Sequence, residues 1–403
     1  MSEKLDGYRA LVLDGYIRNS LAIVKSLSGA GVRCDVVVER HPVQLYAWLQ
    51  RSLRSRYITK VFEIDVHDEE GALASIEEIL KTGHYDFLLA GGTHYSNFLS
   101  KNKSTLSKYS HVLIEDYEKL RKVHDKHSCM EFAARIGVPV PETYRIRDVY
   151  DLKTVADKTG GKVIVKFSDS FASKGLRRFA GSKEEFVEAY QREIGFSHKQ
   201  NNQPVVQRLI LGDLVDSTAF SVAGDAKAVL TQKRELTAWL DGGGGIVNIT
   251  TDHPEIKEHT RTLLQELKWT GHIEMDWIVE EKTGKVYLIE INPKFWGTTQ
   301  LTISAGLDYP LWFCLTALGK PPKYTQSYRV GLRFRWIDDE LVTIFTQPRS
   351  LQRFVTEFEK FIKRFFQKNT ISNFDVRDPA SFLRGLIDAS ILIVKGWVKS
   401  LRR

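Results

Sequence analysis

The feature that most constrains the fold is a change in the order of strands and helices near residue 160. Before it, residues 8–40 alternate as strand, helix and strand, with Gly29 and Gly31 ending the helix, and residues 75–92 repeat the pattern. Such alternation predicts a parallel sheet with helices on both faces. From about 160 to 292 apolar strand segments follow one another closely, which predicts a largely antiparallel sheet. The expected class is therefore α/β followed by α+β.

Length and composition place the chain among soluble proteins of two or three domains. It has 403 residues, 42% of them apolar and 27% charged. Three cysteines without CxxC spacing (Cys34, Cys129 and Cys314) favour a reducing compartment, and the N-terminus lacks the pattern of a signal peptide. We therefore expect a cytoplasmic protein.

The net charge of +8 is consistent with phosphate-bearing partners or an anionic membrane, but the basic residues are too scattered to predict nucleic-acid binding.

Two hard oxygen donors lie two residues apart in the strand "LIEINPKFWG". Glu290 and Asn292 should share one face of the strand, with Ile289 and Ile291 on the other. Asp276 lies in the preceding strand of a hairpin and can lie beside Glu290. Two carboxylates and a carboxamide suit Mg²⁺ or Mn²⁺. The alternative interpretation is a polar strand end with a solvated glutamate.

Two further segments have the residue types of a nucleotide site. Lys166 ends the apolar strand of "GKVIVKFS", and the loop after it offers the N–H groups of Ser170, Ser173 and Gly175 to an anion. In "VVQRLILGD" the backbone can bind a flat heterocycle while Gln207 reads an exocyclic amine. Taken alone, each segment also fits an ordinary strand edge and hairpin loop.

The order of these motifs resembles that of the ATP-grasp superfamily of ATP-dependent ligases. The family pattern begins with a lysine that opens a helix, here Lys126 in "DKHSCMEFAARIGVPVPET". It continues with a strand lysine, a phosphate loop, an adenine-binding linker, an acidic strand and an E-x-N-P-(R/K) strand. The resemblance covers roughly residues 115–315, and the N-terminal unit resembles the preATP-grasp domain.

This resemblance implies two domains, and the helical pattern that follows the resemblance adds a third. They are a Rossmann-like preATP-grasp domain at 1–118, a two-lobed ATP-grasp domain at 119–325 with largely antiparallel sheets, and a helical C-terminal extension at 326–403.

The resemblance also implies roles for individual residues. Asp276, Glu290 and Asn292 would bind the Mg²⁺ or Mn²⁺ ions. The residues that would bind ATP are Lys126, Lys166, Ser170, Ser173, Gly175, Gln207, Arg208, Leu209 and Ile210.

The implied chemistry is transfer of the γ-phosphoryl group of ATP to a small-molecule or peptide-like carboxylate, followed by capture of the acyl phosphate by an amine. Positioning and charge neutralisation suffice for the transfer. We interpret Arg234 and Lys294 as catalytic cations, and Gly242 to Gly245 as a mobile glycine loop near them. Two other functions stay open, a carboxylase-type enzyme on the same site and a non-catalytic nucleotide-binding regulator at a membrane. The substrates and the oligomeric state are not predicted.

The chain departs from the family pattern at three positions. The phosphate loop has a single glycine, Gly175, and Arg208 replaces an acidic or aromatic residue in the linker. Lys294 replaces the more usual arginine and cannot form a bidentate contact.

The C-terminal segment contains two amphipathic helical patterns. The first has an apolar stripe from 351 to 366, and the second, from 382 to 403, has a basic face with Trp397 among its apolar residues. The basic face comprises Arg384, Asp388, Lys395, Lys399 and Arg402. Such a helix can lie on an anionic membrane, here at the inner face, or pack on the core of its own protein.

Overall fold

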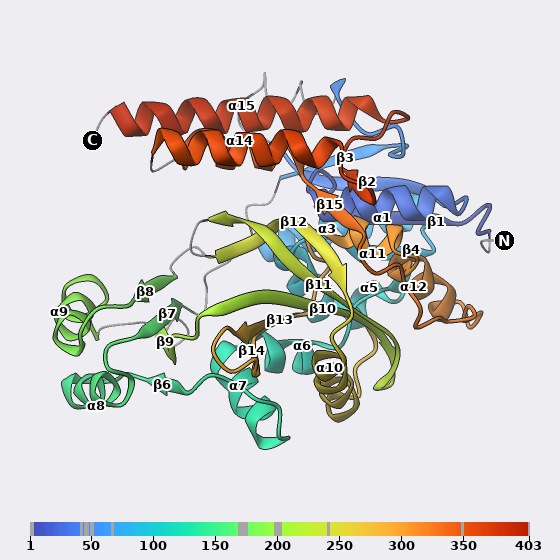
Figure 1. Cartoon of the computed structure of the whole chain (residues 1–403). Coiled ribbons are helices and arrows are strands. Elements are labelled where there is room, and N and C mark those ends of the chain that lie inside the picture. The colour runs from blue at the N-terminus through green and yellow to red at the C-terminus, as the bar shows by residue number, and fades with distance from the viewer. Residues whose placement is uncertain are drawn as a thin grey trace.

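The computed structural model describes residues 4–40, 43, 48, 52–65, 68–167, 176–196, 204–239, 242–347 and 350–401. Three sheets form the body of the molecule, and the long helices of the C-terminal segment lie along one side of it (Figure 1). The mixed α/β architecture expected from the sequence is confirmed. Among the described residues, no helix is both long and apolar enough to cross a bilayer.

The N-terminal sheet is parallel, as predicted, with the strand order β3-β2-β1-β4-β5. Its central strands are apolar and almost wholly buried because helices cover the sheet. The strands are β1 (Arg9–Leu13), β2 (Arg33–Glu39), β3 (Val61–Ile64), β4 (Phe87–Ala90) and β5 (His111–Val112). The helices of this region are α1 (Arg18–Gly29), α3 (Glu69–Gly83), α4 (Thr93–Lys101), α5 (Lys103–Leu106) and α6 (Tyr117–His124).

The central sheet has seven strands in the order β14-β13-β10-β11-β12-β15-β16, all antiparallel except the last pair. Helices α7 and α10 cover one face, and Phe132 and Leu263 pack there against Met275 and Trp277. The strands are β10 (Gly212–Val222), β11 (Asp225–Trp239), β12 (Gly242–Thr251), β13 (Gly271–Glu280), β14 (Val286–Asn292), β15 (Arg333–Arg335) and β16 (Thr370–Ser372). The two helices are α7 (Lys126–Arg135) and α10 (Pro254–Leu267).

A smaller sheet, with the order β6-β9-β7-β8, packs against α8 and α9 to form a separate lobe (Figure 1). Its strands are β6 (Thr143–Arg145), β7 (Val163–Phe167), β8 (Arg177–Phe179) and β9 (Pro204–Arg208). The helices are α8 (Val149–Thr159) and α9 (Lys183–Glu193). Residues 209–211 connect β9 to β10, so the predicted linker joins the small lobe to the central sheet.

The C-terminal segment is folded onto the body of the protein. Besides the expected helices it contains β15 and β16, short strands of the central sheet that the helical pattern did not predict. The helices of this segment are α13 (Ile337–Thr346), α14 (Leu351–Phe365) and α15 (Pro379–Leu401). Two shorter helices precede it, α11 (Thr299–Ser304) and α12 (Tyr309–Ala317).

Side chains tie this segment to the N-terminal domain. Asp375 pairs with Lys25 at 2.7 Å, and Asp378 accepts hydrogen bonds from Ser55 and Arg56. Arg384, predicted on the basic face of the last helix, is buried and donates to the carbonyl of Tyr16. At this residue the helix packs on its own protein, which was one of the two alternatives, because α15 turns the side chain toward the N-terminal sheet.

Candidate active site

The face of the central sheet opposite α7 and α10 carries a row of polar side chains across neighbouring strands. Asp276 of β13 pairs with Glu290 of β14 on one side and with Asp216 of β10 on the other. Glu274, two residues before Asp276, pairs with Asn292. Because cross-strand partners point to the same face, these side chains gather over one area of the sheet. The predicted proximity of Asp276 and Glu290 is confirmed.

A bulge in β14 sets the direction in which Glu290 points. The register shifts between Asp276 and Trp277, so that Trp277 pairs with Leu288 and Asp276 with Glu290, and Ile289 has no partner opposite it. Leu288 therefore packs under the sheet while Glu290 points to the polar face. Simple alternation, which would put Leu288 and Glu290 on the same face, does not hold at this point.

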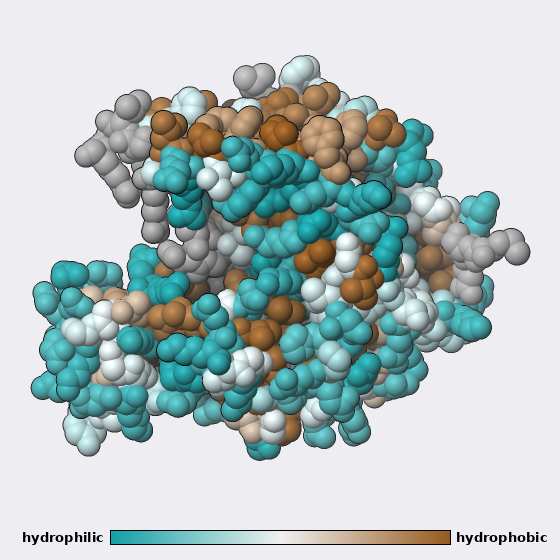
Figure 2. All heavy atoms as spheres, in the orientation of Figure 1, coloured by the Kyte–Doolittle hydropathy of each residue, from teal (hydrophilic) through white to brown (hydrophobic). Residues whose placement is uncertain are grey.

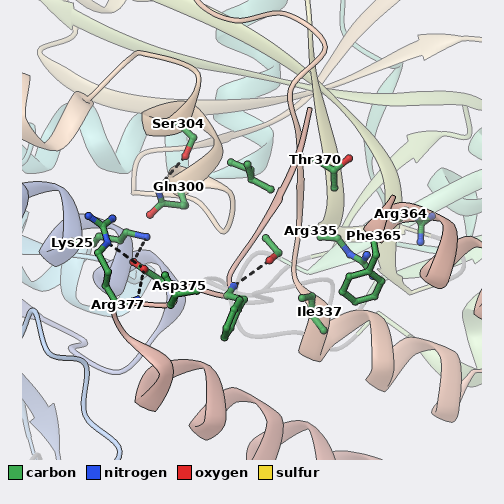
Figure 3. A pocket seen from close by; sticks show the side chains of 14 residues that line it. Lys25, Gln300, Ser304, Arg335, Ile337, Arg364, Phe365, Thr370, Asp375 and Arg377 are labelled. Carbon is green, nitrogen blue, oxygen red and sulfur yellow. Dashed lines mark hydrogen bonds and ion pairs between the residues drawn. The ribbon is translucent and has the colours of Figure 1, made fainter. Parts of the chain in front are cut away.

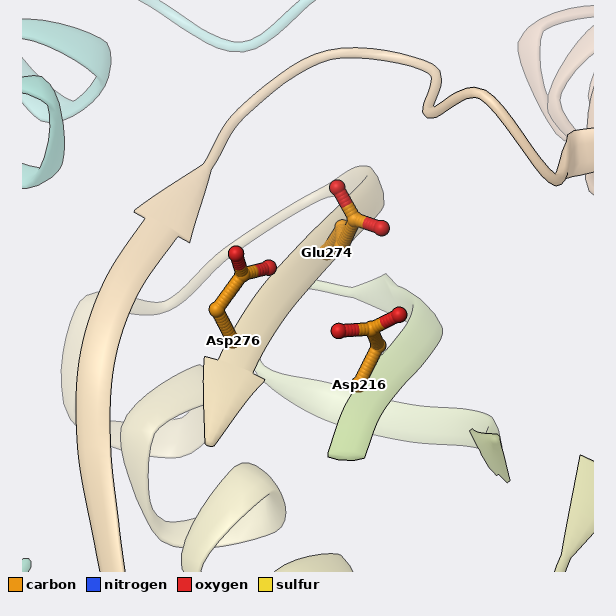
Figure 4. A group of neighbouring side chains, drawn as sticks. All are labelled: Asp216, Glu274 and Asp276. Carbon is orange, nitrogen blue, oxygen red and sulfur yellow. The ribbon is translucent and has the colours of Figure 1, made fainter. Parts of the chain in front are cut away.

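Three carboxylates converge beside the predicted metal residues. Asp216, Glu274 and Asp276 are buried, and oxygens of the three lie within 4.8 Å of one another (Figure 4). Burial, with the neighbouring carboxylates, raises the pKa of Asp216 and raises that of Glu274 well above its usual value. The sequence interpretation missed Asp216 and Glu274. The period-2 argument used for Glu290 and Asn292 applies equally to Glu274 and Asp276 and could have found the second carboxylate.

Arg234 of β11 neutralises two of these carboxylates. Its Nη2 lies 2.5 Å from Asp216 Oδ1 and 2.7 Å from Asp276 Oδ2, while Nη1 donates to the carbonyl of Gly243 at 2.9 Å. Burial alone would lower the pKa of Arg234, but the two aspartates hold it well above its ordinary value. Asp216 also accepts a hydrogen bond from Gln232 at 3.0 Å. Arg234, predicted as a catalytic cation, thus lies at the centre of the acidic cluster.

The predicted glycine loop is a strand. Gly242 to Gly245 form the start of β12, where Gly242 pairs with Trp239 and Gly245 with Thr237. The expectation of a mobile loop was therefore wrong for these four residues. At Gly245 a Cβ would collide with the side chain of Asn248, so the close approach of Asn248 requires glycine there.

The two predicted phosphate lysines approach the same strand from different directions. Lys126 opens α7, and its Nζ lies 3.7 Å from Glu290 Oε1. Lys166 comes from β7 of the small lobe and donates to the carbonyl of Ile289 at 3.1 Å. Burial lowers the pKa of Lys166, and the nearby Glu290 opposes that change. The bulge therefore supplies a backbone acceptor that holds Lys166 beside the acidic face.

Lys294 follows directly after β14, on the side of Glu274 and His272. Its charge acts on both: it opposes the rise in the pKa of Glu274 and adds to the effect of burial on His272, whose pKa falls to about 3. His272 is stacked on Phe295 with ring centroids 3.5 Å apart. Lys294 thus extends the row of cations, with Lys126, Lys166 and Arg234, along the carboxylates.

The predicted adenine segment lies at the junction between the two lobes. The N–H groups of Arg208 and Leu209 donate to the carbonyls of Glu142 and Lys162. Gln207 is buried and donates to Thr143 at 3.1 Å. For the N–H of Ile210 we find no partner within the described part of the chain, so it stays available to a ligand. Ser170, Ser173 and Gly175 lie outside the described residues.

A pocket of about 490 Å³ lies where the C-terminal segment meets α1 and α11 (Figure 3). Its basic side chains already have acidic partners: Arg335 and Arg364 bind Glu340, and Lys25 binds Asp375. This pocket is distinct from the row of cations and carboxylates on the central sheet.

Comparison with known proteins places the fold. A family model described as "ATP-grasp in the biosynthetic pathway with Ter operon" matches residues 222–340. The biotin carboxylase domain of the 2-oxoglutarate carboxylase of Hydrogenobacter thermophilus superposes with a TM-score of 0.64 at 16% identity, over 80% of this chain and 73% of that one. N5-carboxyaminoimidazole synthetase of Staphylococcus aureus superposes with a TM-score of 0.57 at 14% identity, over 82% of both chains. The chain has the ATP-grasp fold.

The curated relatives are longer than this chain. The large chain of carbamoyl phosphate synthase of Thermus thermophilus is 24% identical over 289 residues, which are 67% of this chain and 26% of the relative. The urea amidolyase of Lachancea kluyveri is 23% identical over 221 residues, 52% of this chain and 12% of the relative. The chain thus spans about a quarter or less of the length of these relatives.

Proposed function

We propose that the protein is an ATP- and Mg²⁺-dependent ligase that joins a small-molecule or peptide-like carboxylate to an amine through an acyl phosphate. The observation that carries this proposal is the convergence of Lys126 and Lys166 on the strand that holds Glu290, beside Asp276 and the buried acidic cluster. The relatives support it, since they are named as carbamoyl phosphate synthase, biotin carboxylase and N5-carboxyaminoimidazole synthetase, the last as a complex with ADP.

The donor set fits a hard divalent cation. Asp276, Glu290 and Asn292 offer oxygen ligands from two paired strands. In the structure the amide nitrogen of Asn292 donates to Asp276 Oδ1 at 3.5 Å, so the two side chains lie next to each other. In the proposed site Mg²⁺ would neutralise charge on the β- and γ-phosphates of ATP. Asp216 and Glu274 supply two further carboxylates at the inner side of the site.

The chain's own cations would position the reacting groups. Lys126 and Lys166 would bind phosphate oxygens, and the N–H of Ile210 would contact the adenine. Arg234 donates from Nε to Asp216 and from Nη1 to Gly243, and its Nη2 forms ion pairs with Asp216 and Asp276. The second N–H of Nη1 would bind an incoming carboxylate.

The proposed reaction has two steps. A carboxylate oxygen of the substrate attacks the γ-phosphorus and the bond to the ADP oxygen breaks, which gives an acyl phosphate. The amine nitrogen then attacks the acyl carbon, inorganic phosphate leaves, and the amine gives up a proton. The protein's part is to align the groups and neutralise their charge.

The test is ATP consumption with Mg²⁺ across a panel of amino acids and dipeptides, with ADP and phosphate assayed separately from AMP and pyrophosphate. We expect substrate-dependent ADP release that falls at least about 100-fold in Glu290→Gln, because a metal ligand is lost. Glu281→Gln, an exposed glutamate at the end of the same hairpin, is the matched control and should retain activity. AMP formation, or full activity in Glu290→Gln, would contradict the proposal.

A carboxylase-type reaction is the second candidate, because one structural neighbour is a biotin carboxylase domain in complex with MgADP and bicarbonate. Here bicarbonate would take the place of the carboxylate substrate. ADP release that needs bicarbonate alone, without any amino acid, would favour this candidate over the ligase.

A further inference from the structure

Helix α14 presents a continuous apolar stripe to solvent. Leu351, Val355, Phe358, Ile362 and Phe365 recur every three or four residues, so they lie on one side of the helix. Their side chains are between 39 and 80% exposed. Soluble proteins seldom expose a contiguous apolar surface of several turns without a partner for it.

Helix α15 adds a second set of exposed apolar side chains. Leu383, Ile391, Val394, Trp397 and Val398 are between 37 and 57% exposed. In Figure 2 apolar side chains form a band along α14 and α15, and hydrophilic side chains cover the surface below it. We call the exposed apolar residues of the two helices the apolar band.

Most of the attachment of the two helices comes from residues outside the apolar band. On a different side of α14, Phe361 packs with Ile337 and Ile344 of α13, and Phe382 of α15 packs against the same cluster. Arg364 reinforces the attachment through its ion pair with the buried Glu340 at 3.0 Å. Two residues of the apolar band also contact the body, since Trp397 donates to the carbonyl of Phe345 and Phe365 packs on Arg335. The other residues of the apolar band remain exposed on the two attached helices.

The segment that carries the apolar band has a positive net charge. Residues 350–403 contain eleven Lys and Arg but five Asp and Glu, a net charge of +6, while the whole chain carries +8. Lys360 and Lys363 of α14 are exposed and pair with Glu357 and Glu359 of the same helix. Lys395 of α15 is also exposed. A second copy of the chain on this face would bring two such positive segments together, whereas anionic lipid headgroups would neutralise them.

We propose that the apolar band binds the surface of an anionic lipid membrane, with α14 and α15 lying in the interface and the basic side chains at the headgroups. Apolar area buried in the interface and attraction to anionic lipid act together in such attachment. The attachment is peripheral, since none of the described helices crosses a bilayer. This membrane attachment does not depend on ATP turnover. The sequence predicted a membrane contact for the last helix only, and the proposal adds α14 to that contact.

The test is sedimentation of the full chain with vesicles of phosphatidylcholine alone and of equal parts phosphatidylcholine and phosphatidylglycerol. We expect binding to the anionic vesicles that weakens at least about tenfold in high salt. Val355→Ser combined with Ile362→Ser should weaken it by a similar factor without changing the melting temperature, because both side chains are exposed. Leu351→Ser, at the most exposed position of the stripe, gives an independent variant should the double variant fold poorly.

Tyr150→Ser is the matched control, because Tyr150 of α8 is an exposed large side chain far along the chain from the apolar band. It should bind the anionic vesicles as the wild type does. Absence of binding to either vesicle would overturn the proposal. A second outcome would also overturn the proposal: the wild type is a dimer in sedimentation velocity, the Val355/Ile362 double variant is a monomer, and neither binds vesicles. The apolar band would then be an interface between two copies of the chain.

Discussion

Replacement of Arg234 by methionine tests the electrostatic design of the site. Methionine keeps much of the arginine's length but removes the charge that lies 2.5 Å from Asp216 and 2.7 Å from Asp276. Both aspartates are buried, and removal of one partner of a buried ion pair costs about 3–5 kcal/mol. We therefore expect Arg234→Met to lower the free energy of unfolding by about that amount in metal-free buffer near pH 8, as measured by chemical denaturation.

Two further measurements make this prediction specific. The loss should shrink as the pH falls, because protonation of Asp216, whose pKa burial already raises, removes the unpaired charge. Mg²⁺ should restore stability more in the variant than in the wild type, since a cation that binds the folded state stabilises it by mass action and Arg234 no longer competes for Asp276.

Lys233→Met is the matched control. Lys233 is the preceding residue of β11, and its ion pair with Asp213 lies at the surface, where such a pair contributes about 1 kcal/mol or less. If Arg234→Met were no more destabilising than Lys233→Met in metal-free buffer, the counter-charge role of Arg234 would be refuted.

Three other outcomes follow from buried groups. Lys166→Met should weaken ATP binding at least about tenfold in calorimetry. It should leave the melting temperature unchanged or higher, because a buried ammonium whose pKa is lowered costs stability. Tight ATP binding by the variant would refute the assignment of Lys166 to the phosphates. The pKa of the buried His272 is about 3, against about 6.5 in the unfolded chain, so acid favours unfolding below pH 6.5. Between pH 7 and 5 the wild type should lose about 2 kcal/mol more than His272→Phe, and equal losses would count against a buried neutral imidazole. Glu340→Ala should destabilise by about 3–5 kcal/mol in urea denaturation, because Arg335 and Arg364 would lose their shared buried partner; a loss below about 1 kcal/mol would contradict this.

Much of the architecture could be predicted because its signals are local. The alternation of apolar strands and helices up to residue 118 is enough to predict the parallel sheet, since each element shows its buried side in its own periodicity. The hairpin between β13 and β14 likewise predicts that Asp276 lies beside Glu290, because a short turn leaves few registers. The order of the motifs along the chain likewise predicts the ATP-grasp fold from the sequence alone.

The centre of the candidate site depended on contacts between distant segments. Periodicity shows which face a side chain takes, but not which strand lies next to it. Asp216 and Arg234 join Asp276 only because β10 lies between β13 and β11 in the sheet. The bulge at Ile289 also escaped the alternation rule, and it decides both the direction of Glu290 and the acceptor for Lys166.

The C-terminal segment separates the two kinds of information most clearly. The sequence alone determined that residues 351–366 form an amphipathic helix, because apolar side chains every three or four residues leave no other regular structure. It did not determine whether anything covers that stripe. Only the tertiary structure decided that Arg384 is buried against the N-terminal domain while Val355 and Ile362 face solvent, because burial depends on which surfaces the rest of the chain brings to each side of a helix.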